Sequence, residues 1–149
     1  MTNKTCCFFG LKNLGNGVRR DTAFWLAKQQ IQILIEDGYT DFIFSGEGDF
    51  DNSSRMALIS AKQKDKHLKQ IYYAYPYEDK VILGRKYDEV RILSLAEPDN
   101  SSLNRMQIII DNSNTCVFYI PNSKVISNKA IKYAKEKGKK IINLVDIDS

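Results

Sequence analysis

Short apolar runs alternate with helix-like segments along the chain, and this alternation restricts the fold more than any other feature. Six runs have the length and β-branched or aromatic content of strands, at 4–9, 42–44, 70–75, 89–93, 115–120 and 140–145. Strands that alternate with helices predict an α/β fold, here a Rossmann-like open, mostly parallel sheet of about five or six strands with helices on both faces. The 149 residues suit one domain, so we expect a single domain over 1–149.

The segments between these runs carry helix start and stop signals. We expect a loop over 11–20, a helix from Asp21 or Thr22 to Gly38, and further helices over 51–61 and 102–111. We expect one turn of helix at most over 79–88, a turn at 98–101 and a loop over 121–126. Ser127 is the expected cap of the last major helix, which ends at Gly138.

Composition restricts the cellular setting. No apolar run approaches the roughly 20 residues that cross a bilayer, and residues 1–5 lead into the first expected strand without a signal-peptide pattern. We therefore expect a cytoplasmic protein with no membrane partner. Cys6, Cys7 and Cys116 fall in expected buried strands and lack metal-ligand spacing, so we expect reduced core residues and no metal.

The net charge of +4 is mild, and the surplus lies near the end of the chain. It comes from Lys124, Lys129, Lys132, Lys135, Lys137, Lys139 and Lys140. A solvated helix face is the favoured interpretation, because aromatic residues do not interleave with these lysines as a single-strand binding platform requires. A nucleic-acid partner is the weaker alternative.

The stretch DFIFSGEGDFDNSS, residues 41–54, is the first candidate site. A buried strand leads into a loop with Gly46 and Glu47, and a helix start follows, which Asp51, Asn52 or Ser53 is expected to cap. An open helix start presents unpaired N–H groups and the positive end of the helix dipole. The stretch therefore predicts a site for a phosphate or carboxylate.

The loop after the first strand is the second candidate. Gly10 lies at the carboxyl end of that strand, and the following loop contains Lys12 and Arg19 among glycines. This composition is typical both of an anion-binding turn and of a flexible, solvated loop, and the residues leave the two readings open. In a parallel sheet the loops after strands one, two and five meet at one edge. The residues expected to converge there are Gly10, Lys12, Gly46, Glu47, Asp51, Tyr119 and Asn122.

Four pieces of the chain resemble the SLOG superfamily, a Rossmann-like group, and in particular its YpsA-like branch. They are TCCFFGLK, SGEGDFD, the set Arg105, Asp111 and Ser113, and AIKYAKEKGKKIINL. The chain is similar to a divergent member. The resemblance implies binding of a nucleotide or nucleotide-derived small molecule at the loops after the strands, and it points to Gly10, Gly46, Asp51 and Arg105.

The chain also departs from that family. Leu11-Lys12 replaces the His-Arg pair after the first strand, and the bulky Val125-Ile126 replaces the glycine pair before the last helix. The connection between Tyr75 and Glu89 looks shortened. The PGGxGTxxE motif of the family's cytokinin-activating phosphoribohydrolases does not occur in the sequence, so their hydrolase activity is not implied.

Three functions therefore compete. The first is binding or sensing of a nucleotide-derived, ADP-ribose-like small molecule at the loops after strands one, two and five. The second is a protein or nucleic-acid interaction module with a degenerate pocket. The third is hydrolysis of a nucleotide N-glycosidic or phosphoester bond, with Glu47, Asp49 or Asp51 as general acid or base. We assign no catalytic residue and expect no cofactor beyond a nucleotide-like ligand, and the sequence leaves enzymatic activity and a homo-oligomer open.

Overall fold

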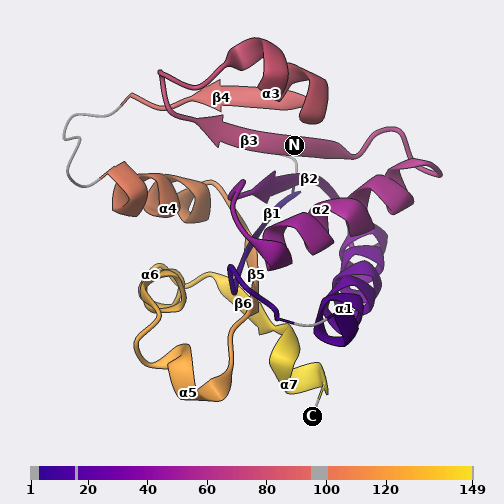
Figure 1. The fold of residues 1–149 in the computed structure, drawn as a ribbon, viewed down its shortest axis with the longest axis vertical. Coiled ribbons are helices and arrows are strands. Elements are labelled where there is room, and N and C mark those ends of the chain that lie inside the picture. The colour runs from indigo at the N-terminus through magenta and orange to yellow at the C-terminus, as the bar shows by residue number, and fades with distance from the viewer. Residues whose placement is uncertain (1–3, 16, 95–100, 149) are drawn as a thin grey trace.

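A six-stranded sheet in which every neighbouring pair is parallel organises the protein (Figure 1). The computed structural model describes residues 4–15, 17–94 and 101–148. The strands are β1 (Lys4–Gly10), β2 (Tyr39–Phe44), β3 (Lys69–Ala74), β4 (Glu89–Ile92), β5 (Thr115–Tyr119) and β6 (Lys140–Asn143). Their order in the sheet is β4-β3-β2-β1-β5-β6. The α/β, Rossmann-like prediction is therefore confirmed.

Helices cover both faces of the sheet (Figure 1). They are α1 (Gly17–Glu36), α2 (Asp49–Lys62), α3 (Lys80–Lys86), α4 (Ser101–Asp111), α5 (Asn122–Val125), α6 (Lys129–Glu136) and α7 (Leu144–Asp148). Helices α1, α2 and α7 lie on one face and α4 and α6 on the other, while α3 lies beside the edge strand β4. In the described part of the chain, no helix has the length and apolar content needed to cross a bilayer.

The strand order places a topological switch between β1 and β5. From β1 the chain moves outward through β2 and β3 to β4, and it then returns through α4 to place β5 on the other side of β1. Right-handed crossovers in opposite directions put the helices on opposite faces. In doubly wound folds such a switch, at the carboxyl ends of the strands, is the usual position of a ligand.

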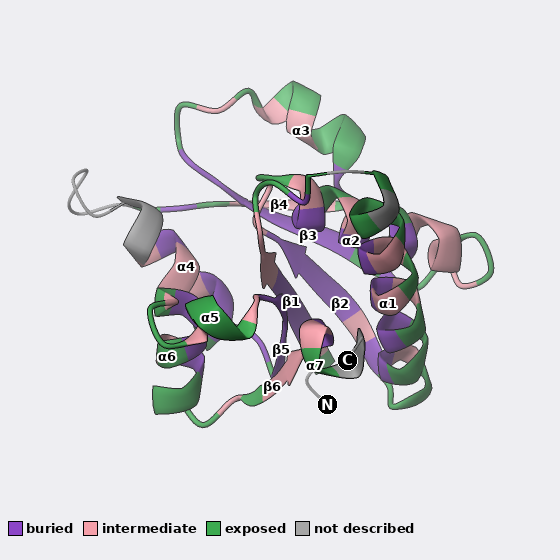
Figure 2. Cartoon of the chain, turned by 60° about the horizontal axis from the view of Figure 1, so that its bottom comes forward, coloured by how far each residue is buried: buried purple, intermediate pink, exposed green. Residues whose placement is uncertain are grey.

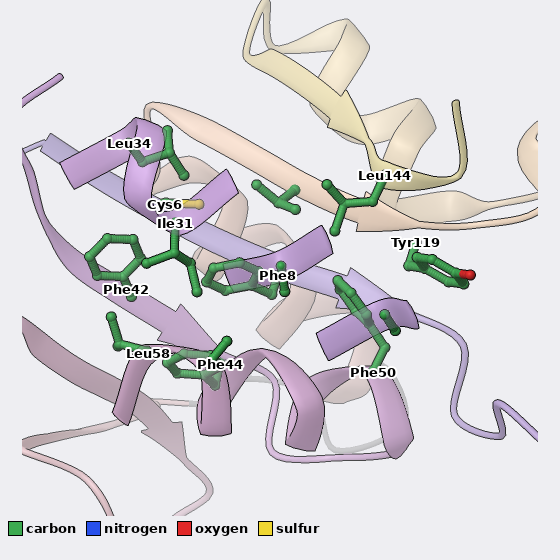
Figure 3. Close-up of a cluster of buried hydrophobic side chains, with 14 of the residues drawn as sticks. Cys6, Phe8, Ile31, Leu34, Phe42, Phe44, Phe50, Leu58, Tyr119 and Leu144 are labelled. Atoms are coloured by element: carbon green, nitrogen blue, oxygen red, sulfur yellow. The ribbon is translucent and has the colours of Figure 1, made fainter. Parts of the chain in front are cut away.

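Two apolar clusters fill the spaces between the sheet and its helices. On the α1–α2 face, Phe8, Phe42 and Phe44 project from neighbouring strands and their rings stack (Figure 3). On the α4–α6 face the alternate strand residues, among them Ile43 and Phe118, form a second cluster. The central strands β1, β2, β3 and β5 are buried on both faces (Figure 2), as a parallel sheet covered by helices requires, whereas the edge strands β4 and β6 are only partly covered. Cys6, Cys7 and Cys116 are buried free thiols, as expected.

Several element boundaries differ from the sequence-based expectation. Helix α1 already begins at Gly17, so 11–20 is not wholly a loop. Helix α3 has 7 residues, more than the single turn expected over 79–88. Its start is stabilised because the Asp79 carboxylate accepts hydrogen bonds from the Val81 and Ile82 N–H groups. The turn expected at 98–101 lies outside the described residues except for Ser101, which begins α4.

The C-terminal part also differs. The short helix α5 forms within the expected loop 121–126. Asn128, not Ser127, caps α6, because its Oδ1 accepts from the Ile131 N–H at 2.9 Å. Strand β6 ends at Asn143 instead of continuing to Val145, because the Asn143 amide bonds the backbone N–H and C=O of Ile120 and the chain turns into α7.

Candidate functional site

The carboxyl edge of the sheet brings most of the predicted site residues together. Gly10 ends β1, and Gly46 follows β2, its parallel neighbour, so both glycines lie at the same edge. Lys12 and Glu47 form an exposed ion pair, with 3.2 Å between Nζ and Oε2. Arg19 is exposed in the first turn of α1 rather than in a loop.

Arg105 reaches the same edge from the opposite face. It projects from α4, and its Nη2 donates a hydrogen bond to the Ser45 carbonyl oxygen, immediately after β2. The structure therefore brings Arg105 next to Gly46. Of the strand-five residues expected here, Tyr119 ends β5 beside Gly10, and Asn122 is exposed in α5.

The start of α2 is closed by the protein's own backbone, which corrects the expectation of an open anion site. The Asp49 N–H donates to the Lys12 carbonyl at 2.9 Å, and the Phe50 N–H donates to the Leu11 carbonyl at 3.3 Å. Gly48, with φ of 93°, permits this approach, because a Cβ there would lie 2.6 Å from the Lys12 Cα. The carboxylates Asp49 and Asp51 in the first turn further disfavour an anion.

The space beside Gly10 is occupied by an aromatic ring. A Cβ at Gly10 would lie 2.3 to 2.8 Å from Phe50 side-chain atoms. Phe50 is fully buried and stacks on Tyr119, with 5.6 Å between ring centroids (Figure 3). On the α1–α2 face, the switch between β1 and β5 is thus packed with side chains, and Gly10 admits a ring rather than a phosphate.

Asp51 holds the loop after β2 in place. Its Oδ1 accepts hydrogen bonds from the Ser45 N–H at 2.7 Å and the Ser45 hydroxyl at 3.0 Å. Burial raises the pKa of Asp51 although these donors work against it. The expected role as helix cap is wrong, because Gly48 is the N-cap of α2 and the Asp51 carboxylate turns back toward β2.

Arg105 is packed between two tyrosine rings. Its guanidinium carbon lies 4.7 Å from the Tyr72 centroid and 5.0 Å from the Tyr75 centroid. Only 6% of the residue is exposed, and its Nε is buried without a hydrogen-bond partner among the described residues. Burial works to lower the pKa of Arg105, but the packed Tyr72 and Tyr75 and the nearby negative charge of Glu78 outweigh it and raise that pKa. Arg105 is therefore a buried cation.

The tyrosine contacts continue on both sides of Arg105. Tyr72 stacks on Tyr87 with centroids 4.8 Å apart, and Tyr75 stacks on Tyr77 with centroids 5.5 Å apart and planes 3° from parallel. Burial raises the pKa of Tyr87 to about 12. We call Arg105 together with Tyr72, Tyr75, Tyr77 and Tyr87 the Arg105–tyrosine cluster. It runs from the α2–α3 side of the sheet, past the ends of β2 and β3, to an exposed ring at Tyr77.

Glu78 fixes the turn that carries these rings. Its carboxylate accepts hydrogen bonds from the Tyr72 hydroxyl at 2.8 and 3.1 Å and from the Tyr75 N–H at 2.9 Å. Lys80 then donates to the carbonyls of Tyr75, Pro76 and Glu78. The exit from β3 and the tyrosine rings on it are therefore held in place by side-chain hydrogen bonds.

Sequence reasoning did not find this cluster. The sequence pattern predicts only a strand over 70–75 there, although tyrosines on both sides of Pro76 are a signal for rings gathered at a strand end. Glu47, Asp49 and Asp51, the predicted acid–base candidates, lie along one loop and helix start, where each is engaged in a hydrogen bond or an ion pair. Hydrolysis stays a prediction.

No protein-family model matches the chain, and no curated protein is significantly similar to it.

Proposed function

We propose that the protein binds a nucleotide-derived small molecule, of the ADP-ribose-like class, at the carboxyl edge of the sheet. In this proposal Arg105 meets the anionic part and Tyr77 meets the base. The observation that carries it is the buried Arg105 guanidinium, whose Nε–H has no hydrogen-bond partner among the described residues. It packs on the Tyr75 ring, and the exposed Tyr77 stacks on that same ring. The proposal moves the site from the loops after β1 and β5 to those after β2 and β3, because Phe50 occupies the space beside Gly10.

The charge of Arg105 supports an anionic ligand. A buried cation is costly unless a partner compensates it. The described ion pairs include none with Arg105, and the nearby Glu78 carboxylate is already engaged by Tyr72 and Tyr75. Arginine presents its donors in a planar fork that suits phosphate and carboxylate. An anion that reaches Arg105 would supply the hydrogen-bond partner that Nε–H lacks among the described residues.

The exposed ring of Tyr77 supports a planar group in the ligand. The side chain is 82% exposed although it stacks in parallel on Tyr75. One ring face is covered by Tyr75, so the other is accessible to a base. Stacking of a base on an aromatic side chain contributes about 1–3 kcal/mol. A phosphate near Arg105 and a base on Tyr77 would together use the two ends of a nucleotide.

Calorimetric titration and thermal unfolding with AMP, ADP, ADP-ribose, NAD and inorganic phosphate test the proposal. A ligand that binds the folded state raises the unfolding temperature, and at 100 times its Kd it stabilises by about 2.7 kcal/mol. We expect Tyr77→Ala to weaken nucleotide binding roughly 5- to 150-fold, the range that the stacking energy implies.

The matched control is Trp25→Ala. Trp25 is another exposed aromatic residue, and it lies on α1, away from β3. This variant should bind like the wild type. The proposal fails if no compound of the panel changes the unfolding temperature at millimolar concentration. It also fails if Tyr77→Ala and Trp25→Ala weaken binding equally.

A further inference from the structure

The positive charge of this protein is concentrated on one segment. The whole chain has 22 Lys and Arg against 18 Asp and Glu, but residues 122–140 contain seven lysines and a single acidic residue, Glu136. The remainder of the chain thus has 15 basic and 17 acidic residues and is slightly acidic. We call this segment, with α5, α6 and the start of β6, the basic surface. Its lysines are Lys124, Lys129, Lys132, Lys135, Lys137, Lys139 and Lys140.

Packing of α6 forces these lysines outward. Ala130, Ile131 and Ala134 are buried against the sheet, so the opposite side of the helix faces solvent (Figure 2). All seven lysines except Lys139 are exposed. Within the described residues, none of the seven forms an ion pair with a carboxylate. The charges of the six exposed lysines are therefore available to a partner.

The basic surface is hollowed beside α4. A cavity of about 190 Å³ opens between α4 and α6, and Met106, Gln107, Lys129, Lys132, Tyr133 and Glu136 line it. Tyr133 is held there by a hydrogen bond from its hydroxyl to Asp111 Oδ1 at 2.8 Å. The hollow gives the surface a concave part flanked by two lysines.

We infer that the basic surface binds the phosphate backbone of a nucleic acid, independently of the proposed small-molecule site. The eight residues of α6 span about 12 Å, and duplex DNA presents about seven negative charges over that length. Lys129, Lys132 and Lys135 lie within this length, so a duplex offers several phosphates to the three lysines at once. A single small anion would use only one or two of them.

One observation favours a nucleic acid over a membrane as the partner of the basic surface. A second favours contact with the phosphate backbone over recognition of the bases. The apolar residues of α6 face inward, and Ile126, 94% exposed, is the only large apolar side chain that the segment 122–140 exposes. Membrane-surface helices instead present an apolar stripe to the lipid. Tyr133 is the only aromatic residue in the segment, so successive bases find no stacking platform.

Fluorescence anisotropy with a labelled 20-base-pair duplex of mixed sequence, repeated across a salt series, tests the inference. Four to five phosphate contacts predict a loss of affinity of roughly a hundredfold or more between 50 and 200 mM salt. Lys129→Gln with Lys132→Gln should reduce the slope of log K against log salt by about two. The control variant, Lys64→Gln with Lys66→Gln, removes the same charge from exposed positions at the amino edge of the sheet and should retain the wild-type slope.

Three outcomes would overturn the inference. The first is no binding of the duplex at 50 mM salt. The second is an equal loss of affinity in the two variants, which would show a response to net charge alone. The third is sedimentation with vesicles containing anionic phosphatidylserine and no binding to the duplex, which would assign the surface to a membrane. Because the Lys129 and Lys132 substitutions leave Tyr77 and Arg105 intact, nucleotide titration of the same variant separates this result from the proposed function.

Discussion

The guanidinium carbon of Arg105 lies 4.7 Å from the centroid of the Tyr72 ring. Tyr72 belongs to β3 and faces the α1–α2 side, whereas Arg105 comes from α4 on the opposite side. The contact therefore passes around the end of the sheet and connects its two layers of helices. The hydrogen bond from Arg105 to the Ser45 carbonyl strengthens the same connection.

Removal of this cation should destabilise the fold. Arg105→Gln loses the contacts with Tyr72 and Tyr75, and we expect a loss of about 2–4 kcal/mol in the free energy of unfolding. Urea denaturation followed by circular dichroism measures it. The control Arg85→Gln, at an exposed position in α3, should change that free energy by less than about 0.5 kcal/mol. Equal effects would contradict a structural role for Arg105.

Gly10 and Phe50 should be energetically coupled. Gly10→Ala places a methyl group within 2.3 to 2.8 Å of the Phe50 side chain, and we expect this substitution to cost about 1–3 kcal/mol. Phe50→Ala removes a fully buried ring and should cost about 3–5 kcal/mol. In the Phe50→Ala background Gly10→Ala should be nearly neutral, because the obstacle is gone. A double-mutant cycle by urea denaturation measures the coupling, and additive effects would refute it.

Two glycines should respond oppositely to alanine. Gly48 has φ of 93° and no room for a Cβ beside Lys12, so Gly48→Ala should destabilise the protein by at least about 2 kcal/mol. Gly84 lies within α3, and nothing lies within 4 Å of a Cβ placed there. Gly84→Ala should therefore stabilise by about 0.5–1 kcal/mol. Thermal unfolding of both variants provides the measurement, and a shift in the same direction would contradict this account.

Asp51 should give stability a distinct pH dependence. Burial raises its pKa above the ordinary value of 3.8, so the folded protein holds this proton to higher pH than the unfolded chain. The contribution of Asp51 protonation to the free energy of unfolding therefore increases as pH falls from the raised pKa toward 3.8. This contribution is lost as pH rises through the same range. Asp51→Asn cannot titrate, so the wild type should gain stability relative to this variant on acidification.

Urea denaturation of both proteins between pH 3 and 7 measures that difference, in which the titration of unaffected carboxylates cancels. The amide oxygen of asparagine can still accept the two hydrogen bonds from Ser45 that reach Oδ1, so the variant should keep the loop conformation. If the wild type instead loses stability relative to Asp51→Asn at low pH, then the hydrogen-bond donors outweigh burial and the pKa is lowered.

Sequence alone determined the layered fold. Apolar runs such as 42–44 are continuous because a parallel strand is buried on both faces, and this pattern is local enough to read along the chain. The predicted parallel sheet also placed Gly10 and Gly46 together at its carboxyl edge, because all strands of a parallel sheet end on the same side. Helix starts were less predictable, since Asp79 and Asn128 act as caps through contacts that several neighbouring residues could equally make.

Only the tertiary structure decided what occupies that edge. Phe50 fills the space beside Gly10, backbone carbonyls of Leu11 and Lys12 close α2, and Arg105 enters from α4 to pack between tyrosines. Each of these contacts joins segments that are distant in sequence. Periodicity specifies which face of an element is buried, but it does not specify which side chain meets which across two packed layers. That choice depends on the shapes and distances of close-packed side chains, which form only when the whole sheet is assembled.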